Sequence, residues 1–237
     1  HNCTMLDLTQ QGQKNGLYCL TIGHRGAAAL CPENTLPSFQ TARDHGADMV
    51  ELDVQQSTDG ELIVFHDETL ARLVEGRGPI ARRPLAELKK LRFRGSSATG
   101  IPTFADLLDL VDGQVPLLIE IKSEWAPPDL VFLKRVASIA AAYKGAVALM
   151  SFDPAVVEAV KAYAPGVPRG IVSGRYSDNG WRTRKISRKR AECLRNLLES
   201  GPCAPDFYAY DVDDLPTPVT EYVRTVQGLP LFTWTVR

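Results

Sequence analysis

Two histidines of this 237-residue chain stand where an apolar run gives way to charged residues. His24 follows the segment YCLTIG and precedes Arg25, and His66 ends the segment LIVFH and precedes Asp67. A single histidine at the end of a strand is more often a hydrogen-bonded structural residue than a catalyst. Two of them beside carboxylates favour acid–base chemistry, because imidazole gains and loses a proton near neutral pH.

Three carboxylates have a spacing that would place them on one side of their strands. Glu51 and Asp53 are two residues apart, and so are Glu120 and Lys122. Side chains two apart on a strand point to the same face. Three carboxylate ligands suit Mg²⁺ or Ca²⁺, with water and a substrate phosphate completing the coordination shell. The sequence therefore predicts a divalent-metal site at Glu51, Asp53 and Glu120, and the alternative is three separate ion pairs.

Arg25 and Lys122 provide positive charge beside these acids. A guanidinium group can hold two phosphate oxygens at once, and a lysine adds a point charge. This combination predicts binding of a phosphodiester. Lys122 could instead form a Schiff base, as in barrel aldolases, but that chemistry would leave the histidines and the carboxylates with little to do.

Short β-branched runs alternate with helical patterns along the chain. Several of the runs, such as LLIEI and VALMSF, are almost entirely apolar, which is typical of parallel strands buried on both faces. The candidate strands are 18–24, 48–54, 61–66, 116–122, 146–152, 169–173, 207–212 and 230–236. Helices between them are predicted to begin after capping residues, which are Thr35, Thr103, Asp153 and Ser187.

This alternation predicts an α/β fold, a (β/α)8 TIM barrel, with a doubly wound open sheet as the alternative. In a barrel the active site lies at the carboxyl ends of the strands, where the histidines, carboxylates and cations fall. One connection departs from the pattern: QQSTDG is too short for a parallel crossover, and Asp59-Gly60 is a hairpin signal. The second and third strands are therefore expected to be antiparallel, with Asp53 roughly opposite His66. No internal repeat or linker is visible, so 1–237 is expected to be a single catalytic barrel domain.

Composition excludes several classes of partner. The net charge of −1 provides no basic field for nucleic acid. The apolar runs are far shorter than the ~20 residues of a membrane span, so no stable membrane insertion is expected. Residues 1–16 lack the apolar centre of a signal peptide. The five cysteines form no CxxC pair, which indicates free thiols in a reducing compartment and predicts a cytoplasmic protein.

The stretch GHRGAAALCPENTLPSFQTARDHGADMVELDVQQSTDGELIVFHD resembles the opening signature of the glycerophosphodiester phosphodiesterase family. The later segments IEIK, MSF and TWTV occur where that family would place them. The resemblance implies a phospholipase-C-like barrel that hydrolyses small glycerophosphodiesters to glycerol 3-phosphate and an alcohol, in lipid and glycerol metabolism.

Two other classes of protein remain as alternatives. An amidohydrolase would need an HxH pair on its first strand, where this chain has His24-Arg25. A binding module without catalysis would be expected to lack one of the acid–base or metal residues.

The resemblance also assigns roles to individual residues. The acid–base pair would be His24 and His66, and the metal ligands would be Glu51, Asp53 and Glu120. The phosphate contacts would be Arg25 and Lys122. Trp234 would line the glycerol or alcohol side, with a core-facing indole as the alternative, and Asn34 matches a loop motif in which a turn or capping role is the alternative to ligand contact.

Some features stay open at the level of sequence. Neither histidine is assigned as acid or base, and the nucleophile is either water or the glycerol 2-hydroxyl, which would give a cyclic phosphate. The family usually continues beyond its WTV segment with a further helix, whereas this sequence ends at Arg237, so we expect either that the C-terminal end of the barrel is missing from this sequence or that the barrel is closed differently. The basic segment SGRYSDNGWRTRKISRKR is expected to be a solvated loop, or alternatively to attract anionic substrate.

Overall fold

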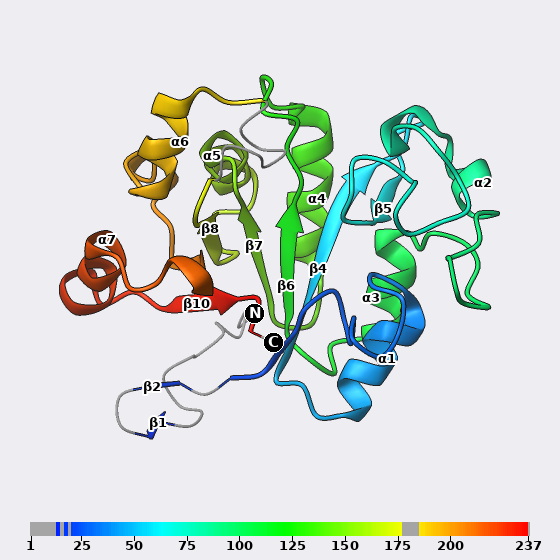
Figure 1. Ribbon diagram of the computed structural model, residues 1–237, viewed down its shortest axis with the longest axis horizontal. Coiled ribbons are helices and arrows are strands. Elements are labelled where there is room, and N and C mark those ends of the chain that lie inside the picture. Colours follow the sequence, from blue (N-terminus) through cyan, green and yellow to red (C-terminus); the bar gives the residue numbers. More distant parts are fainter. Residues whose placement is uncertain (1–12, 15–16, 19, 177–184, 237) are drawn as a thin grey trace. The chain divides into compact units, whose positions relative to one another are not determined.

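Every segment predicted to be extended contains a strand in the computed structural model, which describes residues 13–14, 17–18, 20–176 and 185–236 (Figure 1). Residues 1–16 and the basic segment at 173–190 therefore lie partly outside the described residues. The strands in these segments are β3 (Ile22–Gly23), β4 (Met49–Gln56), β5 (Leu62–Val64), β6 (Leu117–Ile121), β7 (Val147–Ser151), β8 (Arg169–Ser173), β9 (Phe207–Asp211) and β10 (Leu231–Trp234), and β4 extends two residues beyond its predicted end. A short antiparallel pair, β1 (Gln13–Lys14) and β2 (Leu17–Tyr18), precedes them.

The helices begin where the capping residues predict. The side chain of each predicted cap accepts a hydrogen bond from a backbone N–H in the first turn, and the caps are Thr35, Thr103, Asp153 and Ser187. The α-helices are α1 (Leu36–Asp44), α2 (Leu85–Leu88), α3 (Phe104–Val111), α4 (Leu130–Ala142), α5 (Pro154–Tyr163), α6 (Arg188–Arg195) and α7 (Pro218–Tyr222). A π-helical turn, Val223–Gln227, follows α7, and 3-10 turns lie at Ile80–Arg82, Gly201–Cys203 and Val212–Asp214.

The chain divides into two compact units, and the first is built around β4. It comprises residues 1–122 and 142–147. β4 pairs in parallel with β3 on one side and with β6 on the other. β5 pairs with β4 in antiparallel register, with Val54 opposite Val64, which confirms the predicted hairpin. β5 is thus an antiparallel addition to β4 and not one of the parallel barrel strands, because its short connection to β4 leaves no room for a crossover helix.

A small apolar lobe follows β5 within the first unit. Its residues run between 63 and 101, drawn from cyan toward green in Figure 1, and include α2. The buried side chains that form its core are Ile63, Phe65, Leu70, Val74, Ile80, Leu88, Phe93 and Ile101. This packing anchors the segment that carries His66 and the residues after it.

The second unit comprises residues 123–141 and 148–237. Its sheet is wholly parallel, with β8 pairing with β7 and β9, and β9 pairing with β10. Helices α5, α6 and α7 alternate with these strands, as a parallel sheet requires. The core beside β9 includes the buried rings of Tyr208 and Tyr210.

No helix among the described residues has the length and apolar character needed to cross a lipid bilayer.

Candidate active site

Three carboxylates converge inside the first unit. Glu51 and Asp53 project from β4 and Glu120 from β6, and Asp53 is the register partner of Glu120 across the two parallel strands. All three are almost fully buried, at 4%, 0% and 8% exposure. Their ligand oxygens lie within 4.8 Å of one another. The structure thus brings together the three acids that the two-residue spacing placed on one face.

Like charges at this separation disturb one another. Burial raises the pKa of Glu51 well above its usual value, and the neighbouring charges of Asp53 and Glu120 raise it further. Burial would also raise the pKa of Asp53, but the positive charge of Lys122 is the strongest of several influences that hold it below its usual value. The Lys122 Nζ lies 2.6 Å from Asp53 Oδ1 and 2.5 Å from Glu120 Oε1. Three hard oxygen donors with excess negative charge fit a divalent cation such as Mg²⁺ or Ca²⁺.

His24 stands directly after β3, beside this cluster. Its Nε2 lies 3.8 Å from Glu51 Oε2. Burial is the main reason why the pKa of His24 is lowered to about 4, and the adjacent charge of Arg25 acts in the same direction. This lowered pKa favours the neutral imidazole of His24 near pH 7.

His66 follows β5 and is oriented by the next residue. Its Nδ1 lies 2.8 Å from Asp67 Oδ1. An ionised carboxylate only accepts hydrogen bonds, so Nδ1 carries a proton in this pair, which leaves Nε2 to face the reacting groups. A positive charge on His66 would lower the pKa of both His24 and Asp53, so the two rings lie near the same carboxylate cluster.

Arg25 is held in an unusual backbone conformation that points it at the carboxylates. Its φ of 53° lies in the left-handed region, which is uncommon for a residue with a side chain. Its backbone N–H donates to Glu51 Oε2 at 2.9 Å, and its Nη1 donates to Glu33 Oε1 at 2.8 Å. Its Nε lies 3.5 Å from Asp53 Oδ2. The site thus fixes both the main chain and the side chain of Arg25.

Asn34 contacts the acidic cluster itself. It is fully buried, its Nδ2 donates to Asp53 Oδ2 at 2.8 Å, and the Asp53 N–H donates to its Oδ1 at 3.4 Å. Its φ of 57° is also left-handed, a conformation that asparagine tolerates better than most residues. Asn34 therefore combines the turn role with orientation of Asp53.

Two residues of the site, Glu33 and Arg72, were not singled out from the sequence. Both lie in the loops that follow β3 and β5, and they are bonded to each other. Glu33 is part of the PENT segment, but its partner Arg72 lies 39 residues further along the chain, and no local sequence pattern predicts their contact.

Trp234 lies in the second unit, at the end of β10. Its indole meets the ring of Phe152 edge to face, with the ring centroids 5.5 Å apart. Its role toward substrate stays a prediction.

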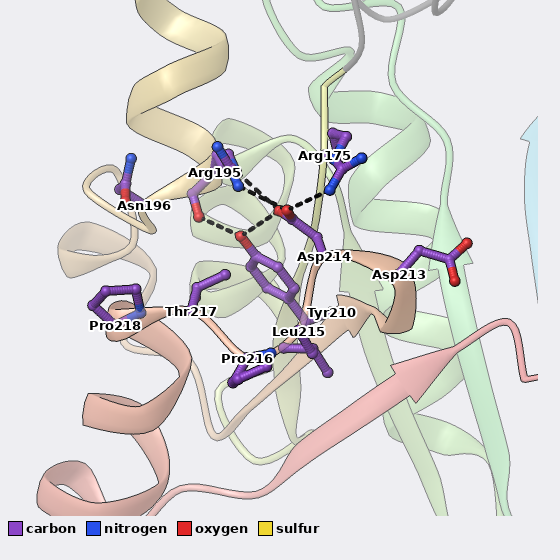
Figure 2. A pocket seen from close by; sticks show the side chains of 10 residues that line it. All are labelled: Arg175, Arg195, Asn196, Tyr210, Asp213, Asp214, Leu215, Pro216, Thr217 and Pro218. Atoms are coloured by element: carbon purple, nitrogen blue, oxygen red, sulfur yellow. Dashed lines mark hydrogen bonds and ion pairs between the residues drawn. The ribbon is translucent and has the colours of Figure 1, made fainter.

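A cavity of about 410 Å³ lies elsewhere, within the second unit (Figure 2). Arg195 bonds both oxygens of Asp214, at 2.9 and 2.7 Å, and Arg175 lies 3.5 Å from the same carboxylate. Tyr210 donates its hydroxyl to the carbonyl of Arg195 at 2.8 Å. None of the predicted site residues lines this cavity, and its two arginines are paired with its own buried acid. The candidate active site is therefore the carboxylate cluster of the first unit.

The comparison with protein families matches residues 24–237 to the Glycerophosphoryl diester phosphodiesterase family. The chain belongs to this family. Every predicted residue of the carboxylate cluster, both histidines and both cations lie within the matched range.

Two related sequences show how far the similarity extends. A glycerophosphodiester phosphodiesterase of Caldanaerobacter subterraneus is 42% identical over 113 residues, which cover 44% of this chain and 45% of that protein. One of Bacillus subtilis is 49% identical over 72 residues, which cover 30% of this chain and 25% of that protein. The chain thus spans less than half the length of either relative.

Solved structures show the fold of the family. The structure of an Oleispira antarctica phosphodiesterase in complex with the product sn-glycerol-3-phosphate matches with a TM-score of 0.74 and 24% identity. The match covers 92% of this chain and 85% of that one. The fold class is therefore the (β/α)8 barrel type predicted from the sequence.

The turn after Arg25 depends on a glycine that a larger residue should disrupt. Gly26 has a φ of +81°, and a Cβ there would lie 2.5 Å from Ser38 Oγ. Gly46 has a similar φ of +75°, with no atom within 4 Å of its Cβ position. We expect Gly46→Ala to cost roughly 1–2 kcal/mol in the free energy of unfolding, from the backbone alone. Gly26→Ala should cost roughly 1–3 kcal/mol more, from the steric overlap.

Urea unfolding of the two glycine variants and the wild type measures this difference. Equal losses for both variants would show that the turn relaxes freely and that Gly26 is not needed for close packing against α1.

The ion pairs of Asp214 predict a pH-dependent contribution to stability. Burial alone would raise the pKa of Asp214, but the hydrogen bonds from Arg195 and the charge of Arg175 outweigh it and lower the pKa. A carboxyl with a lowered folded pKa stabilises the fold above its unfolded pKa of about 3.9 and loses that contribution as the pH falls through the folded pKa. We expect the wild type to lose stability more steeply than Asp214→Asn between roughly pH 5 and pH 3.

The measurement is the free energy of unfolding in urea at several pH values, with the exposed neighbour Asp213→Asn as control. Parallel curves for the wild type and Asp214→Asn would contradict the assignment.

Proposed function

We propose that this chain hydrolyses glycerophosphodiesters to glycerol 3-phosphate and an alcohol with the help of a divalent cation. The observation that carries the proposal is the assembly of three buried carboxylates, two histidines and two cationic side chains in one part of the first unit. Membership of the family supports it, as does the related phosphodiesterase solved with sn-glycerol-3-phosphate.

Glu51, Asp53 and Glu120 would hold the cation, which is Mg²⁺ or Ca²⁺. When bound, it would neutralise charge on a non-bridging phosphate oxygen. Arg25 and Lys122 would bind the remaining phosphate oxygens, and their contacts with Asp53 hold them in place before substrate arrives. Such preorganised charge costs little rearrangement during the reaction.

His24 and His66 would move the protons. One takes the proton of the attacking oxygen, and the other returns a proton to the leaving alkoxide. The attacking oxygen belongs to water or to the 2-hydroxyl of the glycerol group, and the second route passes through a cyclic phosphate. Substrates that lack this hydroxyl separate the two routes, because only attack by water tolerates its loss.

Lys122 is poorly suited to the rival Schiff-base chemistry. Burial would lower the pKa of Lys122, but the carboxylates of Asp53 and Glu120 outweigh burial and raise it. A protonated amine is not a nucleophile, whereas Schiff-base lysines need a depressed pKa. This electrostatic setting favours the phosphate-binding role.

We further propose that residues 1–237 act as one catalytic domain, with Trp234 on the glycerol or alcohol side of the substrate. The family match supports this, since it runs through both compact units. The proposed substrates are small and water-soluble, and their hydrolysis belongs to lipid and glycerol metabolism. A cytoplasmic location is supported by the free thiols of Cys31, Cys193 and Cys203.

Metal dependence is the direct test of the activity. With Mg²⁺ or Ca²⁺ present, the chain should release glycerol 3-phosphate from glycerophosphocholine, glycerophosphoethanolamine or glycerophosphoglycerol, and EDTA should stop the reaction. Crystals soaked in either ion should show it about 2.0–2.6 Å from oxygens of the three carboxylates. Asp53→Asn should weaken cation binding in calorimetry, whereas Asp109→Asn, an exposed position on α3, should not.

The possible failures of this experiment are separable. Absence of turnover with either ion would reject the proposed activity and favour a binding module. Turnover that survives EDTA would reject the cation and leave the hydrolysis in place.

The histidine roles predict large effects on turnover. His24→Ala and His66→Ala should each lower kcat by roughly 10²–10⁴-fold, because each removes a proton carrier, with KM affected less. His45→Ala is the matched control, because His45 caps the end of α1 through a contact with the Thr41 carbonyl. It should retain wild-type kcat. A loss under about fivefold for His66→Ala would make its role structural.

A further inference from the structure

The guanidinium group of Arg72 bonds two carboxylates that come from different loops. Its Nε and Nη2 donate to Oδ2 and Oδ1 of Asp67, at 2.7 and 2.8 Å. Its Nη1 and Nη2 donate to Oε2 and Oε1 of Glu33, at 2.9 and 2.7 Å. Both contacts are bidentate, a geometry that the planar guanidinium group of arginine allows and a lysine ammonium does not. Arg72 therefore fixes the orientation of both carboxylates as well as their position.

Each of these carboxylates continues to a residue with a proposed role in the reaction. Asp67 Oδ1 accepts from His66 Nδ1 at 2.8 Å. Glu33 Oε1 accepts from Arg25 Nη1 at 2.8 Å. A single chain of hydrogen bonds thus runs from the histidine to the arginine, and Arg72 is the link at its centre.

The same region could be mistaken for a second metal site. Glu33, His66 and Asp67 have ligand atoms within 4.8 Å of one another. However, Arg72 already donates to all four carboxylate oxygens of the two acids. The cation that this acidic cluster needs is therefore supplied by the chain.

The exposure of these side chains indicates what Arg72 contributes. Its side chain is 49% exposed, whereas those of Glu33 and Asp67 are 12% and 20% exposed. An ion pair on such an exposed residue contributes little to global stability. Loss of the Arg72 side chain should therefore disturb the orientation of the two carboxylates and change the melting temperature much less.

We propose that Arg72 is a positioning residue, which fixes the carboxylate partners of the histidine and the arginine of the active site. Through Asp67 it orients the imidazole of His66 for proton transfer. Through Glu33 it orients the guanidinium of Arg25 toward phosphate. The inference rests on the proposed function, because the roles of His66 and Arg25 come from it.

The central test is Arg72→Gln, which removes both the positive charge and the bidentate hydrogen bonds. We expect kcat to fall by roughly 10–100-fold, the usual effect of losing a partner that orients a functional side chain, and KM to rise. Arg72→Lys keeps the positive charge but cannot form bidentate hydrogen bonds, so its kcat and KM should stay within about threefold of those of Arg72→Gln. Arg83→Gln is the matched control, because Arg83 is 45% exposed and pairs with Glu87 at 3.0 Å in the same unit. It should leave kcat and KM unchanged.

Two partner variants separate positioning from general destabilisation. Asp67→Asn should lower mainly kcat, and Glu33→Gln should raise mainly KM, because each interrupts one branch of the hydrogen-bond chain. Arg72→Gln should show both effects. A merely structural role would move kcat and KM together in all three variants, in proportion to the loss of stability.

NMR of the imidazole nitrogens gives a readout that does not need turnover. In the wild type, the contact with Asp67 should hold the proton of His66 on Nδ1, and in Arg72→Gln the two tautomers should mix. Should Arg72→Gln not fold, Arg72→Lys serves for the same measurement.

The inference is overturned if kcat and KM of Arg72→Gln lie within twofold of those of Arg83→Gln, or if the tautomer of His66 is unchanged. Absence of turnover by the wild type would reject the proposed function instead. In that case the NMR comparison alone decides the role of Arg72: mixed tautomers support it and an unchanged one rejects it.

Discussion

Burial of three carboxylates at one point is the constraint around which the first unit is arranged. The carboxylate oxygens lie within 4.8 Å of one another, and two ionised groups at that limit would already repel by roughly 3.5 kcal/mol at an effective dielectric constant of about 20. The contact of Lys122 with Asp53 at 2.6 Å is worth roughly 6 kcal/mol of attraction on the same basis, before desolvation is counted. Lys122 therefore offsets much of the repulsion but leaves the cluster with excess negative charge. A divalent cation would neutralise this excess.

The register of the strands brings two of the carboxylates together, and loop residues in strained backbone conformations supply the other contacts of the cluster. Parallel pairing of β4 with β6 sets Asp53 beside Glu120, so no loop rearrangement is needed to bring these two acids together. Arg25 and Asn34, by contrast, reach the cluster only with left-handed backbone conformations. Such conformations persist where the surroundings hold them, and here the hydrogen bonds to Glu51 and Asp53 do so.

Much of this arrangement could be predicted from local pattern. Apolar runs located all eight predicted strands, and the capping residues located the starts of four helices, because both signals depend only on neighbours in sequence. The two-residue spacing of Glu51 and Asp53 predicted their common face, and the short connection with Asp59-Gly60 predicted the antiparallel β5. These features are encoded within a few residues, so they can be predicted without knowledge of any tertiary contact.

The residues that orient the functional groups could be identified only from the folded structure. Arg72 meets Glu33 across 39 positions of sequence, and Asn34 meets Asp53 across 19. No periodicity or spacing signals such pairs, because their members lie in separate segments that only the folded chain brings together. Residue types and local spacing therefore named the groups capable of chemistry, whereas the long-range hydrogen bonds of the fold decided how those groups are aimed.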